Sequence, residues 1–350
     1  MKNLKIVRLC AVIGAACLAL VGCASGADDS PGAKGASNGG TSSSYERIQF
    51  DKKEPLRIGY SVYDLQNPYW QSYSAGVQAA AKEKGVEAVI VDQKSDQSAQ
   101  VSGSLDLVNQ GVSALVITPV QPDALPASID AAHAAKIPVI VADIGAVGDY
   151  DAYLLSNNYE GGVVAAKYLM EQLASVEGKH KVGVIELHPG SVVGEQRVAG
   201  FKETLAGNDA FEVVASLDGN DTVDGGFSAA QDMLSANPDL AAIYAANDDS
   251  AIGAQRALET AKKSTANGFV LIGFDGSKGA LDLIQKGLMT ATIAQDPYGQ
   301  GRKAVEIALD FLAGKSPAYD DEAQRTIYFP VELVDSKNIA QFQVSRAEQK

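Results

Sequence analysis

The chain has 350 residues, and its 46% apolar and 21% charged residues are typical of a globular protein with room for about two domains. Its formal net charge is −14, and −17 once the three basic residues of the leader are set aside. So acidic a surface argues against nucleic acid, anionic lipid and an anionic ligand as partners. Cys10, Cys17 and Cys23 are the three cysteines, so the folded part contains no disulfide, thiol nucleophile or cysteine-based metal site.

The N-terminus reads as a targeting segment. After the basic residues 1–8, Leu9 to Leu20 form an uncharged apolar stretch, too short for the roughly 20 residues that span a bilayer but typical of a signal peptide. The sequence Leu20-Val21-Gly22-Cys23 resembles the lipobox of bacterial lipoproteins. That resemblance implies a signal peptide at 1–22 with Cys23 as the lipid acceptor; a plain signal peptide with an incidental cysteine is the alternative.

A tether is expected between this leader and the folded part, over residues 23–54. Residues 24–44 are nearly all small or polar and contain no large apolar side chain. Such a segment cannot bury enough surface to offset its ordering entropy, so we expect a flexible linker. No later segment is long and apolar enough to be expected to span a membrane.

From residue 56 onward, short apolar runs alternate with helical patterns. Most runs are apolar throughout, which indicates strands covered on both faces, and therefore a parallel sheet with helices on each side. The strands are expected at Leu56–Tyr63, Val86–Asp92, Ala114–Pro119, Pro138–Asp143, Lys181–Leu187, Phe211–Leu217, Ala241–Asn247, Val270–Asp275 and Thr290–Gln295. The helices are expected at Pro68–Lys84, Ser98–Gln110, Gly161–Leu173, Gly226–Leu234 and Tyr298–Leu312.

This strand and helix pattern runs twice along the chain, which predicts an α/β protein with two similar doubly wound, parallel-sheet domains.

Polar residues stand at or just past the ends of four strands: Asp143, Asn247, Asp275 and Gln295. In open α/β sheets ligands bind outside the carboxyl ends of the strands, so these side chains are expected to converge in one cleft. Carboxylates and amides together can accept and donate several hydrogen bonds, which suits vicinal hydroxyls.

An aromatic cluster, Asn67-Pro68-Tyr69-Trp70, adds ring faces on which the C–H face of a sugar can lie. Each of these residues also has a simpler interpretation. Asn67 before Pro68 is a typical helix N-cap, and Asp275-Gly276 is a typical turn. Arg197 can be a surface arginine, and Gln295 can be exposed beside a capping Asp296.

Six segments, in order and spacing, resemble the ribose/galactose-type periplasmic sugar-binding proteins of ABC importers over residues 55–335. The segments are Asn67–Trp70, Ile137–Asp143, Arg197–Phe201, Ala246–Asp248, Gly273–Gly276 and Ala291–Gln295. The resemblance implies that Tyr69 and Trp70 lie against the sugar ring. It also implies hydrogen-bonding roles for Asn67, Asp143, Arg197, Asn247, Asp275 and Gln295.

The family fold consists of two α/β domains joined by three chain crossings. By resemblance the crossings fall near Ser156–Asn158, near Gln295 and near Thr326–Phe329. The N-terminal domain is then expected at 55–156 plus 296–325, and the C-terminal domain at 157–295 plus 326–345.

Two departures from the family pattern concern the ligand. Many ribose binders carry an arginine after the binding aspartate, where this chain has Ile144. A further aromatic of the family is replaced around Asn220-Asp221-Thr222. We therefore expect a pentose, hexose or polyol that is not bound as ribose is.

No catalytic or cofactor motif supports an enzyme. Walker A, GxSxG and HExxH patterns are absent from the sequence, and the acidic run at 218–224 lacks the glycine and glutamate of a calcium loop. His188 follows a strand and is expected to be structural or exposed. We expect no cofactor, no metal and no catalytic residue.

The sequence predicts an extracytoplasmic, substrate-binding lipoprotein of an ABC importer, anchored by its N-terminal lipid to the outer face of the cell membrane. Its expected partners are a small neutral sugar or polyol and the permease subunits, and the protein is expected to be a monomer. A receptor that presents the closed form to a chemosensor or sensor kinase is the alternative. An extracytoplasmic hydrolase or isomerase would need an acid and a base at reactive distance.

Overall fold

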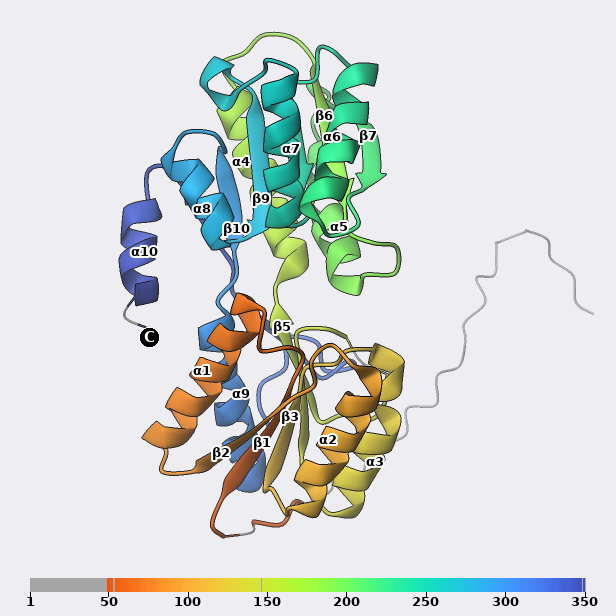
Figure 1. Ribbon diagram of the computed structural model, residues 1–350, viewed down its shortest axis with the longest axis vertical. Helices are drawn as coiled ribbons and strands as arrows, with labels where there is room; N and C mark the ends of the chain where they lie inside the picture. The colour runs from red at the N-terminus through yellow and green to blue at the C-terminus, as the bar shows by residue number, and fades with distance from the viewer. Residues whose placement is uncertain (1–48, 53, 146, 348, 350) are drawn as a thin grey trace, which may run out of the picture. The chain divides into compact units, whose positions relative to one another are not determined.

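The computed structural model describes residues 49–52, 54–145, 147–347 and 349. Two six-stranded sheets organise this part of the chain (Figure 1). The first sheet has the order β11-β5-β4-β3-β1-β2, and every neighbouring pair is parallel. Its strands are β1 (Arg57–Val62), β2 (Glu87–Asp92), β3 (Ala114–Ile117), β4 (Val139–Ala142), β5 (Ala152–Ser156) and β11 (Thr326–Phe329).

The second sheet has the order β12-β10-β9-β8-β6-β7. Only its edge strand β12 runs antiparallel to its neighbour, β10. The strands are β6 (His180–Glu186), β7 (Phe211–Asp218), β8 (Ala242–Ala245), β9 (Val270–Asp275), β10 (Ala291–Ala294) and β12 (Glu332–Asp335). The central strands of both sheets are fully buried, because helices cover both faces.

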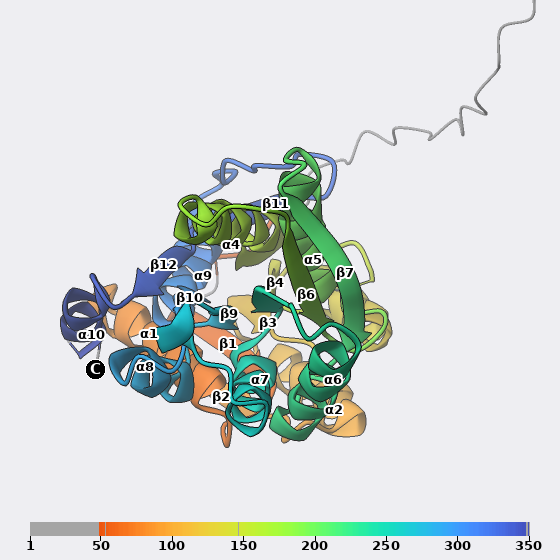
Figure 2. The same ribbon diagram turned by 90° about the horizontal axis from the view of Figure 1, so that it is seen from above.

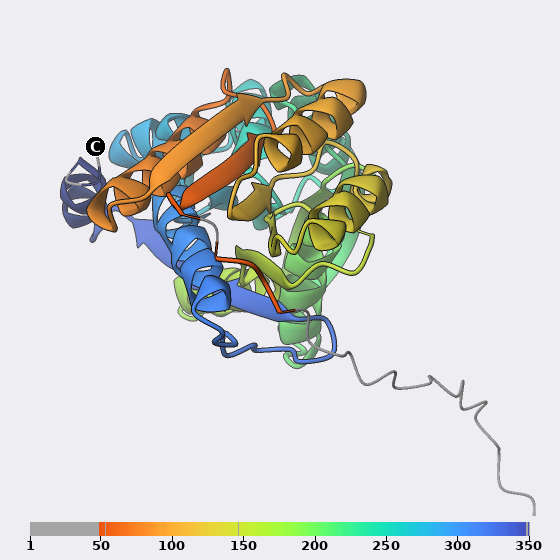
Figure 3. The same cartoon turned by 90° about the horizontal axis from the view of Figure 1, so that it is seen from below.

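Two helix layers cover the first sheet (Figure 3). On one face lie α1 (Pro68–Glu83) and α9 (Pro297–Leu312), and on the other lie α2 (Gln97–Asn109) and α3 (Pro126–Ala134). The short 3₁₀ turn η1 (Pro122–Ala124) leads into α3. The apolar side chains of each layer form a separate core with the strands, as a doubly wound sheet requires.

The second sheet is covered in the same way (Figure 2). On one face lie α4 (Asn158–Leu173) and α5 (Val192–Ala206). On the other lie α6 (Val223–Ala236), α7 (Asp248–Thr260), α8 (Lys278–Gln285) and the C-terminal α10 (Ile339–Ala347). A second 3₁₀ turn, η2 (Thr265–Asn267), precedes β9.

Three helix pairs, α1–α9, α4–α5 and α6–α7, approach each other so closely that only glycine fits. An added Cβ on Gly76 of α1 would lie 2.0 Å from the Tyr298 carbonyl oxygen, and one on Gly301 of α9 would lie 2.1 Å from that of Tyr73. The α4–α5 pair is alike: Cβ atoms on Gly162 and Gly200 would lie 2.1 and 2.0 Å from carbonyl oxygens of the partner helix. These four positions bring backbone against backbone.

The predicted α/β class with two parallel-sheet domains is confirmed, and each predicted strand has a counterpart. β5, β11 and β12 were not predicted from the sequence. One domain boundary was wrong: Thr326–Phe329, expected to open the last stretch of the C-terminal domain, is β11 and pairs with β5 in the first sheet. The third crossing therefore lies between Phe329 and Glu332, where β12 begins in the second sheet.

The predicted signal peptide, the Cys23 lipid site and the tether up to residue 48 lie outside the described residues. Among the described residues, the helices are all too short or too polar to cross a membrane.

Candidate functional site

The four strand-end polar residues stand where the sequence predicts them, at the carboxyl edges of the two sheets. Asp143 directly follows β4, Asp275 is the last residue of β9, and Gln295 directly follows β10. Asn247 caps α7 two residues after β8. In open α/β sheets this edge is where ligands bind.

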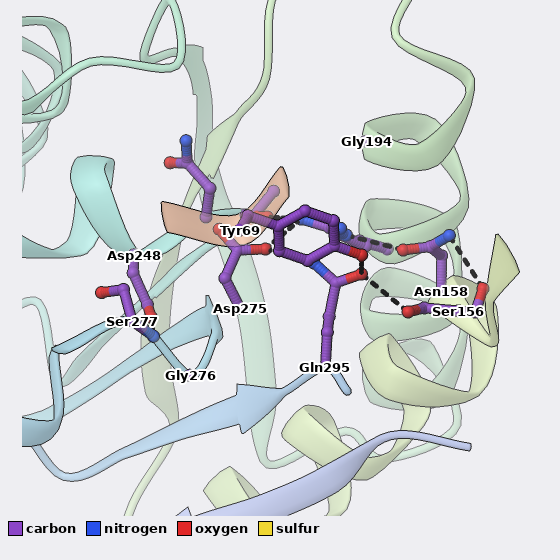
Figure 4. Close-up of polar contacts among 12 residues, drawn as sticks. Tyr69, Ser156, Asn158, Gly194, Asp248, Asp275, Gly276, Ser277 and Gln295 are labelled. Atoms are coloured by element: carbon purple, nitrogen blue, oxygen red, sulfur yellow. Dashed lines mark hydrogen bonds and ion pairs between the residues drawn. The ribbon is translucent and has the colours of Figure 1, made fainter. Parts of the chain in front are cut away.

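A chain of hydrogen bonds runs through the Gln295 side chain (Figure 4). Its Oε1 accepts from the Ser156 hydroxyl at 2.7 Å and from the Tyr69 hydroxyl at 3.2 Å. Its Nε2 donates to Asp275 Oδ1 at 2.8 Å. The network thus joins a side chain of α1 in the first domain to the β9 and β10 ends of the second.

Arg197 of α5 lies deep in the same network and is only 4% exposed. Its Nη1 contacts Asp275 Oδ1 at 3.0 Å and donates to the Ala246 carbonyl at 2.9 Å, while its Nε donates to Asn158 Oδ1 at 2.8 Å. Its guanidinium lies 3.8 Å above the centroid of the Phe274 ring. The surface interpretation of Arg197 is therefore wrong: it is a buried cation paired with a partly buried carboxylate.

Asp143 is 7% exposed, and burial raises the pKa of its carboxyl, although the Tyr69 hydroxyl and the charge of Arg197 act to lower it. Its backbone has φ of 63°, a left-handed conformation that aspartate tolerates better than most residues. The Tyr153 hydroxyl donates to the Asp143 carbonyl at 2.8 Å and helps to hold this turn.

Asp275 has an even less common backbone, with φ of 124°. Its turn is held by Asp248, which is buried and accepts from the Ser277 N–H at 2.6 Å and the Thr292 hydroxyl at 2.7 Å. Burial raises the pKa of Asp275 to about 6, while Arg197 and Gln295 act to lower it. Both carboxylates thus occupy positive-φ positions, a kind of strain that concentrates at binding sites.

Three predicted site residues do not hydrogen-bond to this network: Asn67, Asn247 and Trp70. Asn67 and Asn247 cap α1 and α7, because each Oδ1 accepts a backbone N–H of its helix. Each retains amide N–H groups, and one N–H of Asn247 donates to the Asp221 carbonyl at 3.3 Å. The Asn67 cap interpretation is thus correct, and it leaves a ligand contact open.

Trp70 is 7% exposed and belongs to the core between the first sheet and α1. Its ring centroid lies 4.6 Å from that of Tyr69, in an edge contact. In this structure the indole packs in the core and contacts Tyr69 by its edge, and its implied contact with a sugar ring stays a prediction.

The sequence analysis missed four residues that organise the site: Ser156, Asn158, Asp248 and Gln300. Ser156 ends β5 and Asn158 begins α4, at the first expected crossing, where the sequence suggested no role for either side chain. Asp248 follows Asn247, the N-cap of α7, and is buried. Gln300 carries no local signal, because its role depends on two crossings that meet in space.

The two departures from the family pattern also have structural counterparts. Ile144 is partly buried and packs against the core of the first domain. At the edge of the second sheet, the exposed His188 bonds through Nδ1 to Asp221 Oδ2 at 2.5 Å. Charged and polar groups thus occupy the loop at 220–222.

The donors and acceptors of this arrangement are suited to binding hydroxyl groups. Carboxylates of Asp143 and Asp275 accept hydrogen bonds, whereas the free N–H groups of Arg197, Gln295 and the capping asparagines donate them. Such a mixture recognises hydroxyl groups, each of which can accept and donate at once. Over the described ranges, no group of three or more His, Cys, Asp or Glu side chains is arranged to hold a metal ion.

Comparison with known proteins agrees with this architecture. The model of the periplasmic binding protein domain matches residues 58–316. The ribose import binding protein RbsB of Bacillus subtilis is 33% identical over 286 residues, covering 81% of this chain and 89% of the relative.

Solved structures agree as well. A periplasmic ribose ABC transporter protein from Conexibacter woesei matches with a TM-score of 0.76 and 25% identity, covering 84% of this chain and 97% of that one. A periplasmic solute-binding protein from Actinobacillus succinogenes with bound D-allose matches with a TM-score of 0.72 and 27% identity, covering 82% and 99%. These relatives are binding proteins of transporters and not enzymes. The chain therefore belongs to the periplasmic binding protein family, among the extracytoplasmic, ribose/galactose-type sugar-binding proteins of ABC importers.

Proposed function

We propose that this protein captures a small neutral sugar or polyol at the carboxyl edges of its two sheets and delivers it to a membrane permease. The observation that carries the proposal is the Tyr69–Gln295–Asp275–Arg197 network, in which side chains of both domains share hydrogen bonds at 2.8 to 3.2 Å. The ribose name of the Bacillus relative and the bound D-allose of the Actinobacillus structure support the ligand class.

The charges at the site favour an uncharged ligand. Among the described residues, the buried carboxyl of Asp143 and the partly buried carboxyl of Asp275 lie near one buried guanidinium, that of Arg197. A ligand phosphate or carboxylate would add negative charge beside them, with only one guanidinium to pair with. Hydroxyl groups satisfy the same donors and acceptors without that cost.

Closure around the ligand is the proposed mechanism. Three crossings join the two domains, and the candidate residues stand on both sides of them. A ligand that bonds to both halves favours the conformation in which all bonds form, and its differential affinity for that conformation drives closure. A permease would then recognise the closed form of the monomer.

Ile144 is expected to set the ligand preference. Isoleucine offers apolar contact where an arginine could donate, so D-ribose should bind weakly or not at all, and a sugar with a different acceptor pattern should bind better. A thermal-shift screen of pentoses, hexoses, deoxysugars and polyols tests this, because a ligand at 100 times its Kd adds about 2.7 kcal/mol of stability. Tight D-ribose binding in calorimetry would contradict the role of Ile144. A panel without any stabilising compound would contradict the proposed function.

The lipid anchor is a separate proposal, supported by the Leu20-Val21-Gly22-Cys23 sequence. In cells that process lipoproteins, Cys23→Ser should release the protein from the membrane fraction or leave it unprocessed. Detergent-phase partitioning and the mass of the N-terminal peptide measure the two outcomes, and Cys17→Ser is the matched control. A Cys23→Ser variant that partitions into detergent like the wild type would rule out the anchor.

A further inference from the structure

A buried pair of side chains, Ser156 and Gln300, lies directly behind Gln295. Both are completely buried, Ser156 at the end of β5 and Gln300 in the first turns of α9. Gln300 Nε2 donates to the Ser156 hydroxyl at 3.0 Å and to the Tyr69 hydroxyl at 3.2 Å. One side chain therefore links the first crossing, the helix after the second crossing and the aromatic segment of α1.

The order of donors in this pair determines where the Ser156 proton goes. The Ser156 oxygen accepts from Gln300, and its single proton points to Gln295 Oε1 at 2.7 Å. From the other side, Asp275 Oδ1 accepts from Gln295 Nε2 at 2.8 Å, and an ionised carboxylate can only accept. The Gln295 amide is therefore held between a donor and an acceptor, with its oxygen turned toward Ser156.

We propose that Gln300 is a positioning residue which, through Ser156, fixes the Gln295 amide so that a ligand meets its N–H and not its carbonyl. One N–H of Gln295 bonds to Asp275, and the second N–H is left to donate. The site then selects ligands with an oxygen that accepts at this point. This inference rests on the proposed sugar-binding function and specifies the polarity of one contact in it.

The structure separates this role from a contribution to folding. Gln300 Oε1 is buried and has no hydrogen-bond partner, which is unfavourable for stability. Without Gln300, the Ser156 and Tyr69 hydroxyls still have Gln295 Oε1 as an acceptor. Methionine has a similar length and volume, so Gln300→Met should leave the melting temperature of the ligand-free protein nearly unchanged or raise it.

Side-chain amide NMR of the ¹⁵N-labelled full-length chain tests the positioning without a ligand. In the wild type, the Gln295 amide protons, assigned by their loss in Gln295→Glu, should exchange slowly with solvent. In Gln300→Met this exchange should become about tenfold faster, because one side of the clamp loses its order. Gln255→Met is the control: Gln255 is buried on α7 and bonds to Glu259 of the same helix. Unchanged Gln295 signals in Gln300→Met would overturn the proposal.

Ligand preference gives the second readout. The best binder among D-ribose, D-allose, D-galactose, L-arabinose and myo-inositol is compared with its monodeoxy analogues by calorimetry. Gln300→Met should weaken the parent sugar about 5- to 10-fold but spare the deoxy analogue that lacks the Gln295 contact, so their affinity ratio falls. An equal loss for every compound would mean a purely structural role. If no probe binds the wild type, the proposed function fails, and the NMR result alone decides the positioning role.

Discussion

Asp143→Asn should weaken binding of the sugar identified by the screen by one to two orders of magnitude while leaving the ligand-free protein at least as stable as the wild type. The buried carboxylate is proposed as the main acceptor for the ligand on the first domain, and leaving ligand hydroxyls unpaired in a buried site costs about 1–3 kcal/mol. Asparagine keeps one acceptor oxygen and the shape of the side chain. It also tolerates the φ of 63° at this position, so the backbone is not expected to rearrange.

The expected stability of ligand-free Asp143→Asn follows from the raised pKa of the Asp143 carboxyl. Burial raises the pKa of Asp143, so the folded state disfavours the ionised form relative to the unfolded chain, and the charged group lowers stability at pH 7. A neutral isostere removes that cost. Calorimetric affinity and the ligand-free melting temperature measure the two halves. Asp143→Asn with unchanged sugar affinity would remove Asp143 from the site.

Arg197→Met should abolish detectable sugar binding and destabilise the protein as well. In this variant the partly buried Asp275 carboxylate loses its cation. The Asn158 side chain and the Ala246 carbonyl each lose the donor of a hydrogen bond. Breaking one partner of a buried ion pair costs about 3–5 kcal/mol. Lysine is not expected to rescue it, because one ammonium group cannot replace the separate Nε and Nη1 contacts or the stacking on Phe274.

The loss of stability in Arg197→Met should be larger at high pH than at low pH. Arg197 acts to lower the pKa of Asp275, which is about 6 with the arginine present, so the variant raises that pKa further. At pH 5 the unpaired carboxyl is mostly protonated and its burial costs less than at pH 7.5. The melting-temperature gap between wild type and Arg197→Met should therefore be larger at pH 7.5. The exposed Arg256 of α7 gives a matched control, Arg256→Met. A gap that is absent or equal at both pH values would contradict the pairing.

Strands that are buried on both faces were predictable from the sequence, whereas most of the strands that were not predicted lack this burial pattern. Strands such as β3 and β4 are buried on both faces and therefore read as uninterrupted apolar runs. β5 is also an apolar run that is buried at all five positions, and it was overlooked although it follows this pattern, whereas β11 and β12 are short edge strands with partly exposed side chains. Their assignment depends on pairing partners far away in the chain.

The site shows the same division. Asp143, Asp275 and Gln295 were predictable because each ends an apolar run with a polar group. Asn67 stayed ambiguous because a capping asparagine uses only its oxygen, so a cap and a ligand contact are compatible. Gln300 looks like any helix residue in the sequence, and its importance exists only where Ser156 and Tyr69 meet it in three dimensions.

The glycine contacts between helix pairs bear on how such a protein could acquire a new ligand. Tyr69 and Gln300 stand on α1 and α9, and Asn158 and Arg197 stand on α4 and α5, two of the helix pairs that touch backbone to backbone. One added carbon at Gly162 would collide with the carbonyl of Arg197 itself. Any larger residue at these glycines would therefore force the paired helices apart, although none of the glycines is proposed to contact the ligand. A residue such as Ile144, which is only partly buried, can be substituted without moving these helices. Ligand specificity can therefore change while the helix pairs keep their positions.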